Sequence, residues 1–310
     1  MEVDMKVGFP KGFLYFKYYP FFKNFFNELG AEIITSEDTN KKILDEGVKY
    51  CVDEACLPIK IFHGHVASLR NKCDVMLIPR IMQIRKREYI CPKFCGLPEM
   101  ILNTIPDVPR AITAPFYAVS ESKLYSFAME AGQEITSSKT AIKRAFKTAI
   151  FEQNKFKTRI KNENYSINVA LVGHPYNLYD NFINMNLVKK LNNLGVGVIT
   201  EESINDELID NEVKKLYKRP FWTFARNSYG FAVHSHKNKL VDGIIYISSF
   251  ACGIDSVIVE LIKDNIGESP FMILKVDEHT GEAGLDTRIE AFVDMLERRV
   301  LIENNTSSLG

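Results

Sequence analysis

The sequence predicts an α/β protein built from two doubly wound, Rossmann- or flavodoxin-like domains with parallel sheets. Short apolar runs alternate with longer helical patterns along the 310 residues, and several runs are apolar throughout, as in strands covered on both faces. A polar, lysine-rich stretch at 154–166 interrupts this alternation and suits an exposed linker. We therefore expect domains at 1–155 and 165–302, a cleft between them that holds the functional site, and a flexible tail at 303–310.

The first half of the chain begins with a repeated strand and helix pattern. The run 74–79 (Asp-Val-Met-Leu-Ile-Pro) predicts a strand buried on both faces, because it is apolar without alternation. An extended segment at 88–90 leads directly into Cys91. The remaining elements of this half are strands at 5–10, 31–35 and 110–116 and helices at 13–29, 39–46, 59–70 and 120–155.

The second half repeats the same alternation. Its elements are strands at 167–173, 196–200, 242–250 and 270–276, helices at 184–194, 203–216, 222–239, 256–264 and 285–300, and a polar loop at 277–284. Strand 242–250 runs into Cys252, just before a predicted helix. Ligands of such sheets bind outside the carboxyl ends of the strands, so this junction is a natural place for a site.

The charge balance of the chain excludes several classes of partner. Thirty-nine basic and 39 acidic side chains cancel, so no overall field attracts nucleic acid or an anionic membrane. No apolar run reaches the roughly 20 residues of a membrane-spanning helix, and the N-terminus lacks the pattern of a secretion signal. We expect a cytoplasmic protein, whose six cysteines then suit metal ligands or buried thiols better than disulfides.

Two of these cysteines lie just ahead of a predicted helix. Cys51 and Cys56 precede Pro58, which fits the first turn of a helix because that turn does not use its amide hydrogens, and 59–70 reads as an amphipathic helix. The free amides and the positive end of the helix dipole would stabilise a thiolate or an anionic cluster there. The alternative is that both are small buried apolar residues.

Three cysteines recur at strand-to-helix junctions: Cys56, Cys91 and, in the other half of the chain, Cys252. One shared metal site would explain this convergence. Zinc ribbons usually contribute two close Cys-x-x-Cys pairs, whereas the wider spacing here favours an iron–sulfur cluster. Cys73 precedes the strand at its amino end and suits a buried structural thiol. Neither a Gly-x-Gly-x-x-Gly nor a Walker phosphate loop occurs, so any ATP would be hydrolysed by a partner.

Several short motifs occur in one order along nearly the whole chain. They are 8–11, 15–20, 39–42, 51–58, Phe62-His63-Gly64-His65, 89–93, Gly173-His174-Pro175-Tyr176-Asn177, Phe250-Ala251-Cys252-Gly253-Ile254-Asp255 and 277–284. With these motifs the chain resembles the 2-hydroxyacyl-CoA dehydratase and benzoyl-CoA reductase subunit superfamily, in particular its branch of acyl-CoA dehydratase activase-related proteins.

This resemblance implies an oxygen-sensitive 4Fe-4S type cluster held between two α/β domains by Cys56, Cys91 and Cys252, with Cys51 as the next ligand candidate. Related double-cubane cluster proteins hold more thiolates per site and reduce small molecules. Cys95 stands where an apolar residue is expected, which leaves room for such a larger cluster.

The same resemblance implies low-potential one-electron chemistry, with electrons delivered by a separate ATP-dependent activator protein. On that basis the chain is a dehydratase (lyase) or reductase component acting on an acyl-CoA or a small molecule. The alternative is a non-catalytic accessory or electron-transfer protein that binds the activator or a dehydratase subunit. A homo- or hetero-oligomer is expected from the family alone.

Two further signals concern polar residues beside the expected site. Glu278 and His279 follow the last strand at its carboxyl end and are candidates for proton transfer or for hydrogen bonding to the cluster ligands; the alternative is a loop that caps the next helix. His63 and His65 are two residues apart on the helix at 59–70 and therefore point to different faces, so only one of them can reach the cluster environment.

Overall fold

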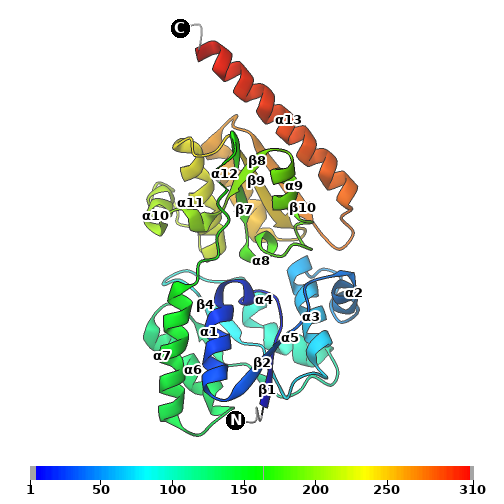
Figure 1. The fold of residues 1–310 in the computed structure, drawn as a ribbon, viewed down its shortest axis with the longest axis vertical. Coiled ribbons are helices and arrows are strands. Elements are labelled where there is room, and N and C mark those ends of the chain that lie inside the picture. Colours follow the sequence, from blue (N-terminus) through cyan, green and yellow to red (C-terminus); the bar gives the residue numbers. More distant parts are fainter. Residues whose placement is uncertain (1–4, 163, 308–310) are drawn as a thin grey trace. The chain divides into compact units, whose positions relative to one another are not determined.

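The computed structural model describes residues 5–162 and 164–307. The chain divides into two compact units. The first runs to Thr158 and takes in Phe221–Thr223, and the second comprises Arg159–Pro220 and the chain from Phe224 onward. Each unit is a parallel sheet with helices on its faces (Figure 1), which confirms the predicted fold class.

The first unit is built on a four-stranded parallel sheet. Its strand order is β2-β1-β3-β5, with β1 at Met5–Phe9, β2 at Ala31–Thr35, β3 at Val75–Leu77 and β5 at Ala111–Ile112. The strand predicted at 110–116 is divided, since β6 (Pro115–Tyr117) pairs instead with β4 (Arg80–Gln83). Pro79 separates β3 from β4 because it has no amide hydrogen for the ladder.

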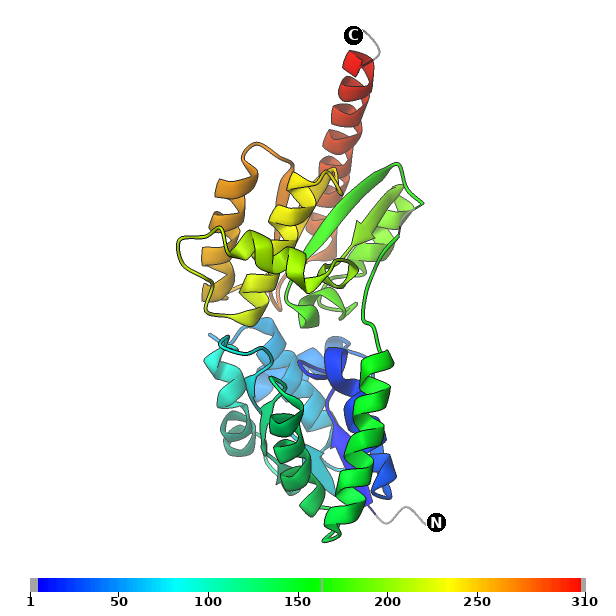
Figure 2. The ribbon, with the colours of Figure 1, turned by 90° about the vertical axis from the view of Figure 1, so that its left-hand side faces the viewer.

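Aromatic side chains fill the core of the first unit. Helix α1 (Tyr15–Glu28) buries four phenylalanines, and α7 (Lys139–Lys155) lies beside it (Figures 1 and 2). The four are Phe21, Phe22, Phe25 and Phe26. The other helices of this unit are α2 (Lys41–Lys49), α3 (Leu57–Leu69), α4 (Pro92–Cys95), α5 (Leu97–Thr104) and α6 (Glu121–Gln133).

Helix α3 lies close to the helix predicted at 59–70. It is buried on nearly every side, so the prediction that it is amphipathic, with one exposed face, was wrong. Helix α2 covers the face of α3 that the sequence pattern left for solvent (Figure 1). Gly47 of α2 and Gly64 of α3 allow this close approach, because a Cβ on either would overlap the backbone of the other helix. The buried polar side chains of α3 are Lys60, His63 and His65.

The second unit is also a four-stranded parallel sheet, in the order β10-β9-β7-β8. The strands are β7 (Ile167–Gly173), β8 (Val196–Ile199), β9 (Gly243–Ser249) and β10 (Phe271–Val276), close to their predicted ranges. The chain moves from β7 outward to β8 and then returns to place β9 on the other side of β7. The switch point of this sheet therefore lies between the carboxyl ends of β7 and β9.

Helices α12 and α13 are longer at both ends than the sequence predicted. Helix α12 (Gly253–Ile266) begins directly after Cys252, and α13 (Glu282–Ser307) extends well past the sheet of its own unit (Figure 2). Helix α13 thus continues into the predicted flexible tail at 303–310, of which 308–310 lie outside the described residues. The remaining helical segments are α8 (Pro175–Leu178), α9 (Leu187–Asn193), η1 (Glu201–Ser203), α10 (Asp206–Val213) and α11 (Thr223–Lys237).

The segment Phe221–Thr223 joins the first unit through Tyr89. The Tyr89 amide donates to the Phe221 carbonyl at 3.0 Å, the Thr223 amide donates to the Tyr89 carbonyl at 3.0 Å, and the Tyr89 and Phe221 rings stack. These contacts hold the extended segment that ends at Cys91. None of the helices in the described part of the chain has the length and apolar character needed to cross a membrane.

Candidate functional site

Three cysteines precede helices, as predicted, but the strand-to-helix prediction is wrong for Cys56, which follows helix α2. Cys91 follows an isolated bridge at Tyr89, and Cys252 follows strand β9. Cys56 is the N-cap residue of α3, Cys91 that of α4 and Cys252 that of α12. In none of the three does the thiol cap the helix with a hydrogen bond. The positive end of a helix dipole therefore lies near each sulfur, although Pro58 and Pro92 have no amide hydrogen and the Ile59 and Phe94 amides donate to the Cys56 and Cys91 carbonyls.

In the first unit, Cys51, Cys56 and Cys91 form one neighbourhood, which we call the thiol group. Each is a free, half-buried thiol. Burial raises the pKa of Cys56, the nearby Cys91 raises it further, and the charge of Lys93 opposes the shift. Burial likewise raises the pKa of Cys51 to about 11, with Cys56 contributing in the same direction. Cys56 is therefore close enough to Cys51 and to Cys91 for the charges of these thiols to interact.

Two lysines bring positive charge to the thiol group. Lys60 on α3 is 1% exposed, and its Nζ donates to the Asp53 carbonyl at 2.8 Å, which ties down the loop between Cys51 and Cys56. The charges of Lys60 and Lys93 both favour the thiolate form of Cys51. Electropositive surroundings of this kind are typical of cysteines that bind metals or react as thiolates.

Cys95 and Cys73 have different surroundings. The Cys95 thiol lies 3.5 Å from the Met82 sulfur. The Cys73 thiol donates to the Leu69 carbonyl at 3.5 Å and lies against Gly8 of β1, just ahead of β3. Cys73 therefore occupies the amino end of its strand, as the sequence predicted.

His63 and His65 are both buried in α3, each with its own polar contact. His63 Nδ1 lies 2.8 Å from the Ile59 carbonyl oxygen, and His65 Nε2 lies 2.9 Å from the Thr39 hydroxyl. Burial lowers the pKa of His65 to about 3, and the charge of Lys11 adds to this effect. His65 is therefore neutral at physiological pH.

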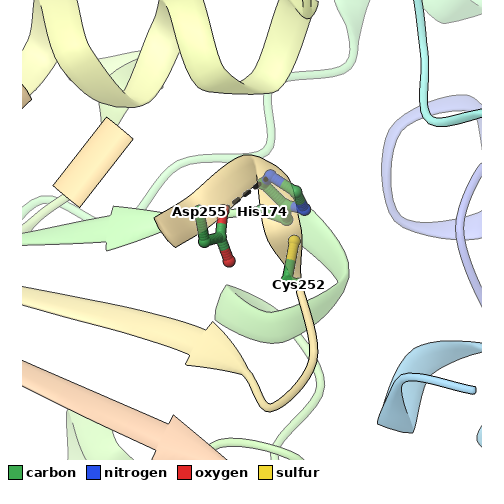
Figure 3. A group of neighbouring side chains, drawn as sticks. All are labelled: His174, Cys252 and Asp255. Atoms are coloured by element: carbon green, nitrogen blue, oxygen red, sulfur yellow. Dashed lines mark ion pairs between the residues drawn. The ribbon is translucent and has the colours of Figure 1, made fainter. Parts of the chain in front are cut away.

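The second unit brings together His174, Cys252 and Asp255 (Figure 3). One potential ligand atom from each lies within 4.8 Å of the others, and this is the only such group of three in the described residues. His174 follows β7 and Cys252 follows β9, so the group occupies the switch point of the sheet. We call it the His-Cys-Asp group.

His174 and Asp255 were not among the predicted site residues. Both lie within motifs that carry the family resemblance, but the predicted metal ligands were all cysteines. The signal that could have found them is positional: residues that follow two neighbouring parallel strands meet at one edge of the sheet. Only the pairing of β7 with β9, which the sequence does not reveal, places them together.

The backbone fixes the His-Cys-Asp group from both strands. Gly173 has a φ of +150°, and a Cβ there would lie 2.5 Å from the Ile247 carbonyl oxygen, so glycine alone fits before His174. Ala251, just before Cys252, has a φ of +62°, a left-handed conformation that costs a non-glycine residue about 1–2 kcal/mol. Strain of this kind clusters at functional sites.

Hydrogen bonds hold the Asp255 carboxylate in place. Tyr246 Oη donates to Oδ1 at 2.8 Å, and Ser248 Oγ donates to Oδ2 at 2.7 Å. Burial alone would raise the pKa of Asp255, but attraction to His174 and these hydrogen bonds outweigh it, so the pKa is lowered. His174 is 3% exposed, and its Nδ1 is hydrogen-bonded to the Tyr176 hydroxyl.

Glu278 and His279 lie in a turn organised by Asp277. The Asp277 carboxylate accepts from the His279 amide at 2.9 Å and from the Thr280 hydroxyl at 2.7 Å. The His279 side chain is 86% exposed, with its Nε2 3.9 Å from the Glu278 carboxylate. This geometry favours the loop interpretation of the motif.

Comparison with known families gives one match. Residues 6–204 match the family model described as "CoA enzyme activase uncharacterised domain (DUF2229)". The match covers the thiol group and His174 and ends before Cys252 and Asp255. No curated protein matches the chain.

Proposed function

The chain belongs to the family of CoA enzyme activase uncharacterised domains, whose model spans residues 6–204 of its 310, and from this premise we propose that it is an iron–sulfur protein that serves a CoA enzyme. This family fits the activase-related branch that its sequence motifs resemble. Membership alone names neither a cofactor nor a substrate. The thiol group supports the proposed cofactor.

The observation that carries the proposal is the convergence of Cys51, Cys56 and Cys91 in one electropositive region. Two of the three stand at helix N-termini, where the positive end of the peptide dipoles offsets negative charge. Lys60 and Lys93 add two positive charges. An iron–sulfur cluster bound to thiolates is anionic, so this chemistry fits the group.

The spacing of the sulfurs supports a cluster over a single ion. Within the described residues the three thiols do not fall in a group tight enough for one metal ion, whereas the His-Cys-Asp group does. A cubane places its thiolates on different iron atoms and therefore farther apart than the ligands of one ion. Cys252, which the sequence predicted as a ligand of the same cluster, lies instead beside the nitrogen donor of His174 and the oxygen donor of Asp255 in the second unit.

Such a cluster, when bound, would supply one-electron transfer at low potential. The residues of the chain would set its environment: the thiolates would bind it, the charge of Lys93 favours the Cys56 thiolate, and Lys60 holds the loop around it. No phosphate-binding loop motif occurs in the sequence, so we propose that a partner ATPase energises the electrons. The finer proposal is a role in acyl-CoA dehydration or reduction of the 2-hydroxyacyl-CoA dehydratase type.

Anaerobic purification and reconstitution with iron and sulfide test the proposal. We expect stoichiometric iron and sulfide, a brown protein, and an electron paramagnetic resonance signal of a reduced cluster after dithionite. A colourless chain without acid-labile sulfide would contradict it. Hydrolysis of ATP by the purified chain alone would indicate an ATPase instead.

A second assay separates a catalytic from an accessory role. The reconstituted chain is given a 2-hydroxyacyl-CoA, reductant, ATP and a purified activator. Turnover by the chain itself identifies a dehydratase-type enzyme, whereas electron uptake without turnover identifies an electron-transfer or accessory protein.

A further inference from the structure

The second unit carries a second, separate site. We infer that His174, Cys252 and Asp255 bind a single divalent transition-metal ion, with zinc or ferrous iron as the chemical class. The inference does not rest on the cluster proposed for the first unit. It rests on the position of the group in the sheet, on the geometry of its donor atoms and on their chemistry.

The distance between the two hard donors suits one shared ion. His174 Nε2 lies 3.2 Å from Asp255 Oδ1, yet among the described residues this nitrogen has no hydrogen-bond partner of acceptable geometry. Nitrogen and oxygen ligands about 2.1 Å from a tetrahedral ion lie about 3.4 Å from each other. One ion placed between these two atoms could therefore bind both.

The remaining atoms of both residues are already oriented. His174 Nδ1 is hydrogen-bonded to the Tyr176 hydroxyl, which turns Nε2 toward Asp255. Ser248 and Tyr246 donate to the Asp255 carboxylate and keep it an anion. Metal-binding histidines and carboxylates are held in place by outer hydrogen bonds of this kind.

Cys252 supplies the soft donor. Its sulfur points toward the His174 ring in Figure 3, and it belongs to the set of atoms within 4.8 Å of one another. One imidazole, one thiolate and one carboxylate are ligands that zinc and ferrous iron share. The helix that begins at Gly253 adds its free amides beside the thiolate.

The site retains an open side. A cavity of about 400 Å³ is lined by Cys252 and Asp255, and Lys263 and Lys275 also line it. Three protein ligands with an open fourth position are typical of catalytic rather than structural metal sites. The fourth ligand is then water or a small anion entering from this cavity.

A cysteine nucleophile with a histidine base is the competing interpretation. In such a pair the histidine has to accept the thiol proton. Here one ring nitrogen is bonded to Tyr176 and the other faces Asp255, so one of these contacts would have to be given up. The arrangement therefore fits a metal ligand better than a general base.

The test uses the full chain with Cys56→Ser and Cys91→Ser, which removes two thiols of the first unit, and titrates the metal-free protein with Co²⁺ alone. We expect one equivalent of bound Co²⁺ with a thiolate-to-cobalt charge-transfer band, displaced by Zn²⁺. Adding Cys252→Ser should abolish the band, and His174→Gln or Asp255→Asn should weaken binding tenfold or more. The matched controls are Cys73→Ser and His279→Gln, which should change nothing.

Three results would overturn the inference. They are the absence of stoichiometric Co²⁺, a band that survives His174→Gln in a protein whose circular dichroism is unchanged, and rapid alkylation of Cys252 that excess Zn²⁺ does not slow. Tyr176→Phe gives a milder check, since loss of the orienting hydrogen bond should weaken Co²⁺ binding about tenfold without loss of the thiolate band. Because two cluster thiols are absent from every sample, failure of the cluster proposal would leave this outcome unaffected.

Discussion

Gly47 of α2 and Gly64 of α3 lie directly against each other's helix. A Cβ on Gly47 would lie 1.8 Å from the Lys60 carbonyl oxygen, and a Cβ on Gly64 would lie 1.8 Å from the Ile43 carbonyl oxygen. The two helices therefore leave no room for a side chain at either position. The contact seals α3, whose first turn carries Cys56 and Lys60, between α2 and the rest of the first unit.

Gly64→Ala should accordingly destabilise the first unit by about 3 kcal/mol, since the clash is with backbone and the helices have to separate. The measurement is the urea midpoint of the metal-free protein, followed by far-ultraviolet circular dichroism. Gly281→Ala is the control, because a Cβ there meets nothing within 4 Å. Equal midpoints for the two variants would show that α2 and α3 are not packed in this way.

Gly173→Ala should disturb the His-Cys-Asp group through its backbone. The new Cβ would press on the Ile247 carbonyl and displace His174. In the background that carries Cys56→Ser and Cys91→Ser, the Co²⁺ affinity should therefore fall at least tenfold. Gly195→Ala is the matched control, since Gly195 has a φ of +76° but open space around it. If both variants bind Co²⁺ like the parent, the close approach at Gly173 does not position His174.

His65 should make the stability of the first unit fall as the pH falls. Its pKa of about 3 in the folded chain lies below the ordinary value of about 6.5, so between these values the unfolded chain binds more protons. Stability is then full above about pH 6.5 and is lost progressively toward pH 3, by up to roughly 5 kcal/mol.

Urea unfolding at pH 7, 6 and 5 tests this dependence, with His65→Asn as the variant. Asparagine does not titrate, so the variant should lose less stability across these pH values than the parent. His279→Gln removes an exposed histidine and should leave the slope unchanged. A parallel slope in the His65 variant would contradict the assignment.

The sequence predicted the architecture well because buried parallel strands are recognisable from composition alone. The runs at 167–173 and 270–276 became β7 and β10 almost unchanged. The positions of Cys56, Cys91 and Cys252 before helices were predicted from the same alternation. These features depend on neighbours in the chain, which a sequence displays directly.

The features that were missed depend on pairing in space. His174 meets Asp255 only because β9 pairs with β7, and α3 is fully buried only because α2 packs on it. Tyr89 and Phe221 pair although they are 132 residues apart in the sequence, which no local pattern records. Long-range pairing of this kind is set by topology, so residue spacing alone does not predict it.

Lys60 should tune the cluster proposed for the first unit. Lys60→Gln removes a buried positive charge beside the thiol group and weakens the tether to Asp53. A nearby positive charge stabilises the reduced, more anionic cluster, so its removal should make the reduction potential more negative and lower the bound iron. Anaerobic spectroelectrochemistry gives the potential, and Lys72→Gln, an exposed change, is the control. A potential shifted to more positive values would contradict this role.

Iron and acid-labile sulfide per chain, measured after anaerobic reconstitution, test the central claim most directly. The parent chain and Cys73→Ser should each hold about four of both, as a 4Fe-4S cluster requires, and Cys56→Ser or Cys91→Ser should lose most of both. Cys51→Ser is expected to retain a cluster with an altered spectrum if Cys51 is a replaceable third ligand. Parent-like iron and sulfide in both Cys56→Ser and Cys91→Ser would contradict the account.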